Sequence, residues 1–354
     1  RTDKTSEYAS VKMAAGEANR FESVIPAEAL KDAQHLYYYL EATDGTNVTT
    51  LPASGGEPYD VRVFQSAGSS VPGLLITELV PDNKGSDAYE YVEVYNNSSE
   101  SVNLRDYQLV YEFYHGSTIR WDIADDLTVP SQGTAVVWVQ SNLTAGKPVS
   151  DFNAHWKTNL PETKVVSLYS IGLSNSAEGR ILIAPDAESP VDHARGAVSQ
   201  AWYNVGLDEV NDDGKSVVYE YPKDGSNRMY KRSAGQTATP GVVLEGQVPE
   251  APVPAPEDKA KPVIEFQPAS GTQPFGDLTV KAKVTDDVSV KRVSLMYKRA
   301  SDADYREANL VRSAAKPDEY TGAVPKELLL GAEAVDYYIE ATDGRNVVRT
   351  TDGG

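Results

Sequence analysis

Hydrophobic and polar residues alternate with a period of two along much of the chain. One such segment, LTVKAKVTDD (278–287), alternates up to Val284 before two aspartates end the pattern. Another, VKRVSLMYKR (290–299), places Val293 and Leu295 on one face. A period of two predicts strands with one buried face. Similar short runs recur between Gly, Pro, Asn and Asp clusters, which predicts an all-β chain of serial immunoglobulin-like β-sandwich domains.

One phrase of the sequence occurs twice. YYYLEATDGTN (37–47) returns as DYYIEATDGRN (336–346), and at the same offset 21–47 matches 320–346. A repeat of this length indicates two homologous domains. Carried back at that offset, the first residue falls near the end of a strand of the last domain. We therefore expect 1–70 to be the C-terminal half of an immunoglobulin-like or fibronectin III-like domain.

A proline-rich segment marks a domain boundary. GQVPEAPVPAPEDKAKP (246–262) contains five prolines and no aromatic residue. This composition predicts an extended, polyproline-like spacer without a core. We therefore expect a domain at 71–245, a proline-rich linker at 246–261 and a complete immunoglobulin-like or fibronectin III-like domain at 262–354.

Two parts of the chain resemble known families. The last domain, with KPVIEFQPA, LTVKAKVTDD and DYYIEATDGRN, resembles the fibronectin type III-like and immunoglobulin-like modules of secreted bacterial proteins. The middle segment resembles the extended bacterial type of the lamin tail domain, an immunoglobulin-like fold. The matching motifs are ITEL, EYVEVYN, VNLRDYQL and LTVPSQGTAVVWV, followed by GRILIAP and the closing ATPG.

The lamin tail resemblance implies a role as well as a fold. Such domains carry no known catalytic residues, and in bacteria they accompany immunoglobulin-like repeats and secreted phosphoesterase or nuclease domains. An accessory, binding or spacing role is what this resemblance implies.

Composition restricts the partners of the chain. Among 354 residues there is no cysteine, and 33 basic against 52 acidic side chains give a net charge of −19. A charge of that sign repels nucleic acid and anionic lipid, so we expect no nucleic-acid partner. No apolar run reaches the roughly 18–20 residues of a membrane helix, which predicts no membrane insertion. The first residues lack the pattern of a signal peptide, so any export signal is expected to lie outside this sequence.

Catalytic motifs are missing, and one metal motif is present. The four histidines are far apart in sequence and form no close ligand pair, and no G-x-S-x-G elbow occurs. We therefore predict no catalytic residues, no enzyme activity and no organic cofactor. The segment EVNDDGKSVVYE places oxygen ligands at the positions of a calcium loop, which are Glu209, Asn211, Asp213 and Glu220. The alternative is a solvated acidic turn, because the loop begins with Glu and a strand pattern follows it.

The sequence favours a non-catalytic, extracellular structural or adhesive protein of a bacterial surface or matrix. The alternative is the accessory region of a secreted phosphoesterase or nuclease whose catalytic domain lies outside this chain. A half-domain at 1–70 leaves an open strand edge, which predicts self-association and assembly into polymers, with truncation as the simpler explanation. Another protein or a glycan surface is a further partner that the sequence leaves open.

Overall fold

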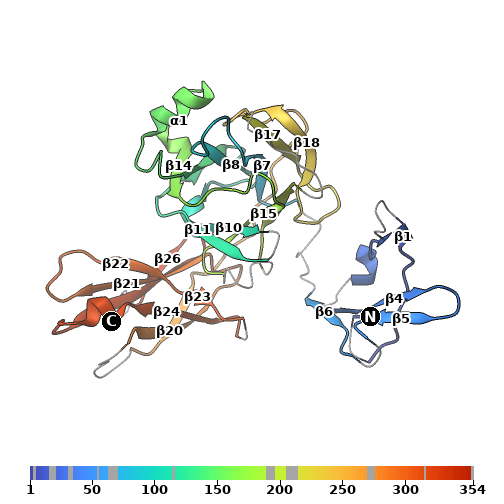
Figure 1. Cartoon of the computed structure of the whole chain (residues 1–354). Helices are drawn as coiled ribbons and strands as arrows, with labels where there is room; N and C mark the ends of the chain where they lie inside the picture. Colours follow the sequence, from blue (N-terminus) through green and yellow to red (C-terminus); the bar gives the residue numbers. More distant parts are fainter. Residues whose placement is uncertain are drawn as a thin grey trace. The chain divides into compact units, whose positions relative to one another are not determined.

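The fold was obtained as a computed structural model. It describes residues 1–2, 5–15, 21–30, 35–53, 56–62, 71–113, 116–188, 196–204, 214–268, 276–314 and 316–351. The chain divides into two units, Arg1–Ser70 and Val71–Gly354. Strands dominate both units (Figure 1), as the period-two pattern predicts. No helix in these ranges is long and apolar enough to cross a membrane.

The N-terminal unit consists of small sheets. Its described strands are β1 (Ala14–Ala15), β2 (Phe21–Glu22), β3 (His35–Tyr38), β4 (Leu40–Thr43), β5 (Val48–Leu51) and β6 (Tyr59–Arg62). They pair as β1–β2, β3–β6 and β4–β5. Of the large apolar side chains described here, Tyr37 is buried, whereas Phe21 and Val24 are 60% and 83% exposed. The described part of this unit therefore has almost no hydrophobic core.

The second unit begins with a sandwich that we call the central sandwich, from β7 to β18. Its six-stranded sheet has the order β14-β13-β8-β7-β17-β18, its four-stranded sheet has the order β11-β10-β15-β16, and a short ladder joins β9 and β12. The strands are β7 (Leu74–Val80), β8 (Glu90–Asn96), β9 (Val102–Asn103), β10 (Tyr107–Phe113), β11 (Thr118–Asp122), β12 (Thr128–Val129), β13 (Thr134–Gln140), β14 (Val165–Tyr169), β15 (Gly179–Pro185), β16 (Ser199–Tyr203), β17 (Lys215–Glu220) and β18 (Tyr230–Thr237).

Both faces of the six-stranded sheet are covered. One face joins the four-stranded sheet in a core that includes Val92 and Val137 from one sheet and Ile181 from the other. Over the other face lies helix α1 (Val149–Trp156), whose Phe152 packs against Trp138. Coverage on both sides explains why every residue of β7 and β8 is buried, in place of an alternating pattern.

The chain ends in a second sandwich, the C-terminal sandwich, made of β19 to β26. Its sheets have the orders β19-β20-β24-β23 and β22-β21-β25-β26. The elements are β19 (Val263–Phe266), β20 (Leu278–Thr285), β21 (Arg292–Arg299), β22 (Arg306–Asn309), β23 (Val311–Arg312), β24 (Glu319–Val324), α2 (Lys326–Leu329), β25 (Val335–Thr342) and β26 (Val347–Arg349). Strand β20 alternates buried and exposed residues along its length, and Val293 and Leu295 of β21 are fully buried. The period-two prediction is confirmed for β20, whereas in β21 Arg292 and Ser294 of the opposite face are buried as well.

The repeated phrase forms the same turn in both units. In each copy one aspartate, Asp44 or Asp343, accepts hydrogen bonds through Oδ1 from the two backbone N–H groups that close a hairpin. Its Oδ2 accepts from the side chain of Asn47 or Asn346, at 3.0 and 2.8 Å. The glycine after each aspartate has a positive φ, 93° in Gly45, which this turn requires. The backbone N–H of Asn47 is the main reason that the pKa of Asp44 falls to about 2.

Candidate functional site

The predicted calcium loop lies mostly outside the described residues. Glu209, Asn211 and Asp213 are not among them. Gly214 has a φ of 71°, and Glu220 ends strand β17, where it accepts a 3.5 Å contact from Lys223. The strand after the loop agrees with the pattern that argued against a helical calcium motif. The calcium loop itself stays a prediction.

The described residues bring together a different set of functional groups, at the joint between the central and C-terminal sandwiches. Arg292 of β21 donates from Nε to Asp106 Oδ1 at 3.2 Å, and both side chains are 9% exposed. Asp106 closes a short 3-10 turn directly before β10. These two residues are 186 positions apart, so no local sequence motif predicts the pair.

Arg292 is the centre of a wider ion-pair network. Its Nη1 lies 3.2 Å from Glu307 and 3.6 Å from Glu340, and it donates to Ser294 at 2.8 Å. Glu307 also forms an ion pair with Arg105 of the central sandwich. Burial raises the pKa of Asp106, and the charge of Arg292 opposes that rise. The network therefore places the charged side chains of Arg292 and Asp106 at a joint where both are largely shielded from water.

Beside the network, a loop of the central sandwich enters the core of the C-terminal one. Ala187 follows β15 and is fully buried among the apolar residues of the C-terminal sandwich. Its N–H donates to the carbonyl of Lys291, and its carbonyl accepts from the N–H of Arg312, both at 2.8 Å. Glu188 pairs with Arg312 at 3.1 Å. Backbone, charge and apolar contacts thus meet at one loop.

The same loop is fastened from the central side. Arg120 donates to Asp186 at 2.6 Å, and Gln108 donates to the carbonyl of Glu188 at 2.7 Å. Burial raises the pKa of Asp186 to about 7, although Arg120 opposes the shift. The loop is therefore fixed before it reaches the neighbouring sandwich.

The proline-rich segment, for which the sequence predicts an extended spacer, is hydrogen-bonded to the central sandwich. Val253 donates to the carbonyl of Asn97 at 2.7 Å and accepts from Ser99 at 2.9 Å. Gln247 is 1% exposed, and its amide donates to the carbonyls of Thr77 and Tyr219. The prolines lack N–H groups, but the residues between them have N–H groups that bond to the sandwich.

The last domain also holds this segment. Arg345 donates to both carboxylate oxygens of Glu100 at 2.9 Å and to the carbonyl of Pro256 at 2.9 Å. A bidentate guanidinium–carboxylate pair fixes direction as well as distance. The linker, the loop and the ion-pair network are therefore three separate attachments between the two sandwiches.

Two buried carboxylates on neighbouring strands look at first like an acid–base pair. Glu78 and Glu93 are 2% and 0% exposed and face each other across β7 and β8. Burial raises the pKa of both, that of Glu93 to about 8. Their oxygens are occupied by the protein, since Glu93 accepts from Gly241 at 2.6 Å and Glu78 accepts from Thr239 at 3.1 Å. They hold the closing ATPG segment and offer no open position for a substrate.

The histidines can be placed only in part. His155 lies on α1 and stacks on Tyr89 with ring centroids 3.9 Å apart, and burial lowers its pKa. His115 and His193 lie outside the described residues. Among the described residues, no arrangement of side chains indicates catalysis.

The comparisons with known proteins agree with this architecture. The family model for the lamin tail domain matches residues 67–192. An uncharacterized protein of Bacillus subtilis (strain 168), YvnB, is 27% identical over 348 residues, which are 95% of this chain and 26% of that protein. The chain therefore spans about a quarter of the length of this curated relative.

Similarity to solved structures is weak. Red sea bream transglutaminase aligns with 87% of this chain and 37% of its own chain, at 11% identity and a TM-score of 0.16. The assignment therefore rests on the family match, on the all-β fold and on the sandwich that contains most of the matched residues. On these grounds residues 67–192 match the lamin tail domain, and the all-β remainder of the described chain is consistent with flanking immunoglobulin-like domains.

Proposed function

We propose that this chain is a non-catalytic structural segment of an extracellular bacterial protein, in which the lamin tail domain and the C-terminal sandwich act as one stiff spacer. The observation that carries the proposal is the insertion of Ala187 into the core of the neighbouring sandwich. Simple tethered domains move relative to each other, because few contacts cross a flexible linker. Here a buried residue and its two backbone hydrogen bonds cross the joint.

The three attachments between the sandwiches resist different motions. The Arg292 network and the Ala187 loop oppose separation of the two facing surfaces, and the Arg345–Glu100 pair opposes rotation about the linker. A spacer that transmits position between its two ends needs this combination. Net charge of −19 suits a role in solvent, where like-charged surfaces stay apart.

Stiffness can be measured by single-molecule energy transfer in the full chain. The chain contains no cysteine, so labels can be placed on two introduced cysteines, at exposed Leu143 in the lamin tail domain and exposed Leu330 in the last sandwich. We expect one narrow distance distribution. Ala187→Glu should broaden it, because a charged side chain does not fit the core. Ala303→Glu, at an exposed position of the same sandwich, is the control and should leave it narrow. A broad distribution in the unmodified chain would contradict the proposal.

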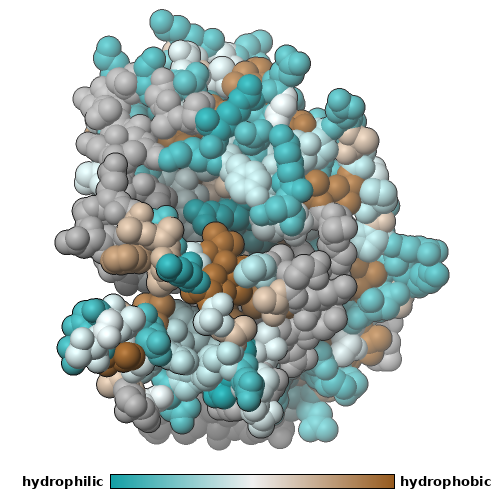
Figure 2. Space-filling view, turned by 90° about the vertical axis from the view of Figure 1, so that its right-hand side faces the viewer, coloured by the Kyte–Doolittle hydropathy of each residue, from teal (hydrophilic) through white to brown (hydrophobic). Residues whose placement is uncertain are grey.

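We further propose that the protein is adhesive and assembles into polymers. The N-terminal unit exposes apolar side chains such as Val48 and Leu51, at 62% and 55%. Figure 2 shows one face of the molecule, on which hydrophobic atoms reach the surface in scattered patches between hydrophilic ones. Strand addition by a second copy would cover such positions. Sedimentation velocity at several concentrations tests this, with a concentration-dependent increase in mass as the expected result.

The second candidate function is an accessory region of a secreted phosphoesterase or nuclease. It is favoured by the length of the relative, three quarters of which lies outside the aligned region. Deleting this segment from the full-length protein separates the two candidates. Loss of activity toward a polymeric or surface-bound substrate, with activity toward a small phosphodiester unchanged, would support the accessory role. The isolated segment is expected to hydrolyse neither substrate.

A further inference from the structure

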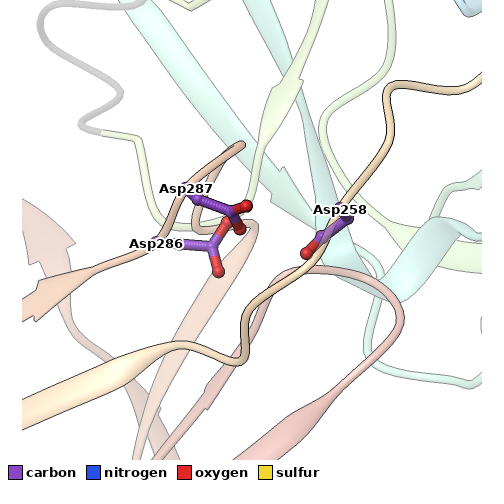
Figure 3. Close-up of side chains that lie close together, drawn as sticks. All are labelled: Asp258, Asp286 and Asp287. Carbon is purple, nitrogen blue, oxygen red and sulfur yellow. The ribbon is translucent and has the colours of Figure 1, made fainter.

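Three aspartates converge where the linker enters the C-terminal sandwich. Asp258 lies at the end of the linker, and Asp286 and Asp287 lie in the turn between β20 and β21. Each offers a carboxylate oxygen, and these three oxygens lie within 4.8 Å of one another. Figure 3 shows the three carboxylates pointing toward one another from the two segments.

The cluster contains buried oxygens without hydrogen-bond partners. The Asp258 side chain is only 5% exposed, and its Oδ1 is buried and accepts no hydrogen bond within the described structure. The same holds for Oδ2 of Asp286. A buried carboxylate oxygen without a partner is costly, and a protein normally supplies a donor or an ion. Two oxygens of the cluster are therefore buried and available to a ligand.

The remaining oxygens are held in place by the backbone. Oδ1 of Asp286 accepts from the N–H groups of Val288 and Ser289 at 2.9 and 2.8 Å. The carboxylate of Asp287 accepts from the N–H groups of Lys259 and Ala260, both at 3.3 Å. These bonds orient the carboxylates and fasten the linker to the turn, but they leave the negative charge uncompensated.

Arg345 borders the cluster but does not neutralise it. Arg345 Nη1 is 4.0 Å from Asp258 Oδ2, whereas its Nε and Nη2 bond to Glu100 and its Nη2 also bonds to Pro256. Burial and the charges of Asp343, Asp286 and Asp287 raise the pKa of Asp258. Four aspartates therefore lie close together, and Arg345, which is already bonded to Glu100, does not balance their charge.

We propose that Asp258, Asp286 and Asp287 bind one Ca²⁺ ion that joins the linker to the C-terminal sandwich. Ca²⁺ takes oxygen ligands at about 2.3–2.6 Å, so two ligands on opposite sides of the ion are at most about 4.6–5.2 Å apart. The observed spacing fits that span. Water fills the other positions, because Asp287 is exposed. This site is distinct from the loop at 209–220, and its binding does not depend on whether the chain serves as a spacer.

Isothermal titration of the full chain with CaCl₂ tests the site. We expect one site, with a Kd of about 10⁻⁴ to 10⁻³ M, the range of extracellular calcium-binding modules. Asp258→Asn and Asp286→Asn should each weaken binding at least about tenfold, because each removes one charged ligand. Asp304→Asn, an exposed aspartate of the same sandwich, is the matched control and should bind like the unmodified chain.

A second variant and a second measurement keep the result unambiguous. Asp213→Ala should leave the calcium heat unchanged; loss of binding in this variant, with binding retained in Asp258→Asn, would assign calcium to the 209–220 loop and overturn the proposal. In chelator, Asp258→Asn should melt at or above the temperature of the unmodified chain, because it relieves repulsion. In Ca²⁺ it should melt lower. Equal melting curves with and without Ca²⁺, compared at equal ionic strength, would also overturn it.

Discussion

Replacing Arg292 by alanine should destabilise the joint more than any other single loss of charge at the surface between the sandwiches. Two of its partners keep another cation, since Glu307 still pairs with Arg105 and Glu340 pairs with Arg349 at 2.8 Å. Asp106 loses its direct partner and stays 9% exposed. The cost is therefore dominated by one buried carboxylate left without its ion pair.

The size of the effect follows from that orphaned charge. Breaking a buried ion pair by removing one partner typically costs about 3–5 kcal/mol. For a sandwich of this size, each kcal/mol lowers the melting midpoint by roughly 4–8 °C. We therefore expect the transition that reports the C-terminal sandwich to fall by more than about 10 °C. Asp106→Asn should cost less, because an amide tolerates burial better than a charge.

Calorimetry of the full chain is the suitable assay, because a multi-domain chain need not unfold in two states. Lys283→Ala is the matched control, since Lys283 pairs with Glu265 at 3.1 Å and both side chains are at least half exposed. An exposed pair contributes about 0–1 kcal/mol. Replacing both partners, Arg292→Met with Asp106→Leu, should recover much of the loss. If Arg292→Ala shifted the midpoint no more than Lys283→Ala, the reasoning from burial would be refuted.

Three further predictions concern other parts of the chain. Burial raises the pKa of Glu93 to about 8 in the folded state, so its contribution to stability is complete below its ordinary pKa and is lost as the pH rises through about 8. The melting midpoint should therefore be higher at pH 6 than at pH 9. Glu93→Gln should reduce this dependence of the midpoint on pH without removing it. Gly179→Ala should destabilise the central sandwich by about 2 kcal/mol or more, measured by urea unfolding, because its new methyl group would meet the Tyr203 ring at 2.5 Å; an unchanged midpoint would mean that the ring moves freely. The fragment 1–70 should aggregate or lack a cooperative melt, whereas 71–354 should be a folded monomer by sedimentation; a cooperative, monomeric 1–70 would refute the half-domain interpretation.

The sequence predicted the strands well where one face of a strand meets water. In β20, Leu278 to Val284 are buried at every second position, as the period of two required. The pattern was less informative in β7, where Thr77 and Glu78 look like exposed positions but are buried. Glu78 is covered by Thr239, which is 161 positions away. A periodic pattern reports which residues alternate, but not which distant segment covers them.

The joint was beyond the reach of sequence analysis for the same reason. Asp106 and Arg292 are ordinary charged residues in their local contexts, and only the packing of two domains makes them partners. The proline-rich segment shows a second limit. Its composition predicted an extended spacer without a core, but composition does not reveal that Val253 and Gln247 bond to the central sandwich. The calcium loop motif, by contrast, remains a prediction from spacing alone.

The position of Ala187 bears on how these domains could be exchanged during evolution. From the sequence alone, the proline-rich linker is the expected recombination site, because its composition differs from that of the strands on either side. A breakpoint there would separate Ala187 from the pocket of the following sandwich that it fills, and would leave Arg312 without the carbonyl that its N–H contacts. Joined to an unrelated neighbour, the C-terminal sandwich would therefore have a cavity in its core, and the central sandwich would have an exposed Ala187 loop. Recombination is therefore expected to keep the two sandwiches together, with its breakpoints outside the linker.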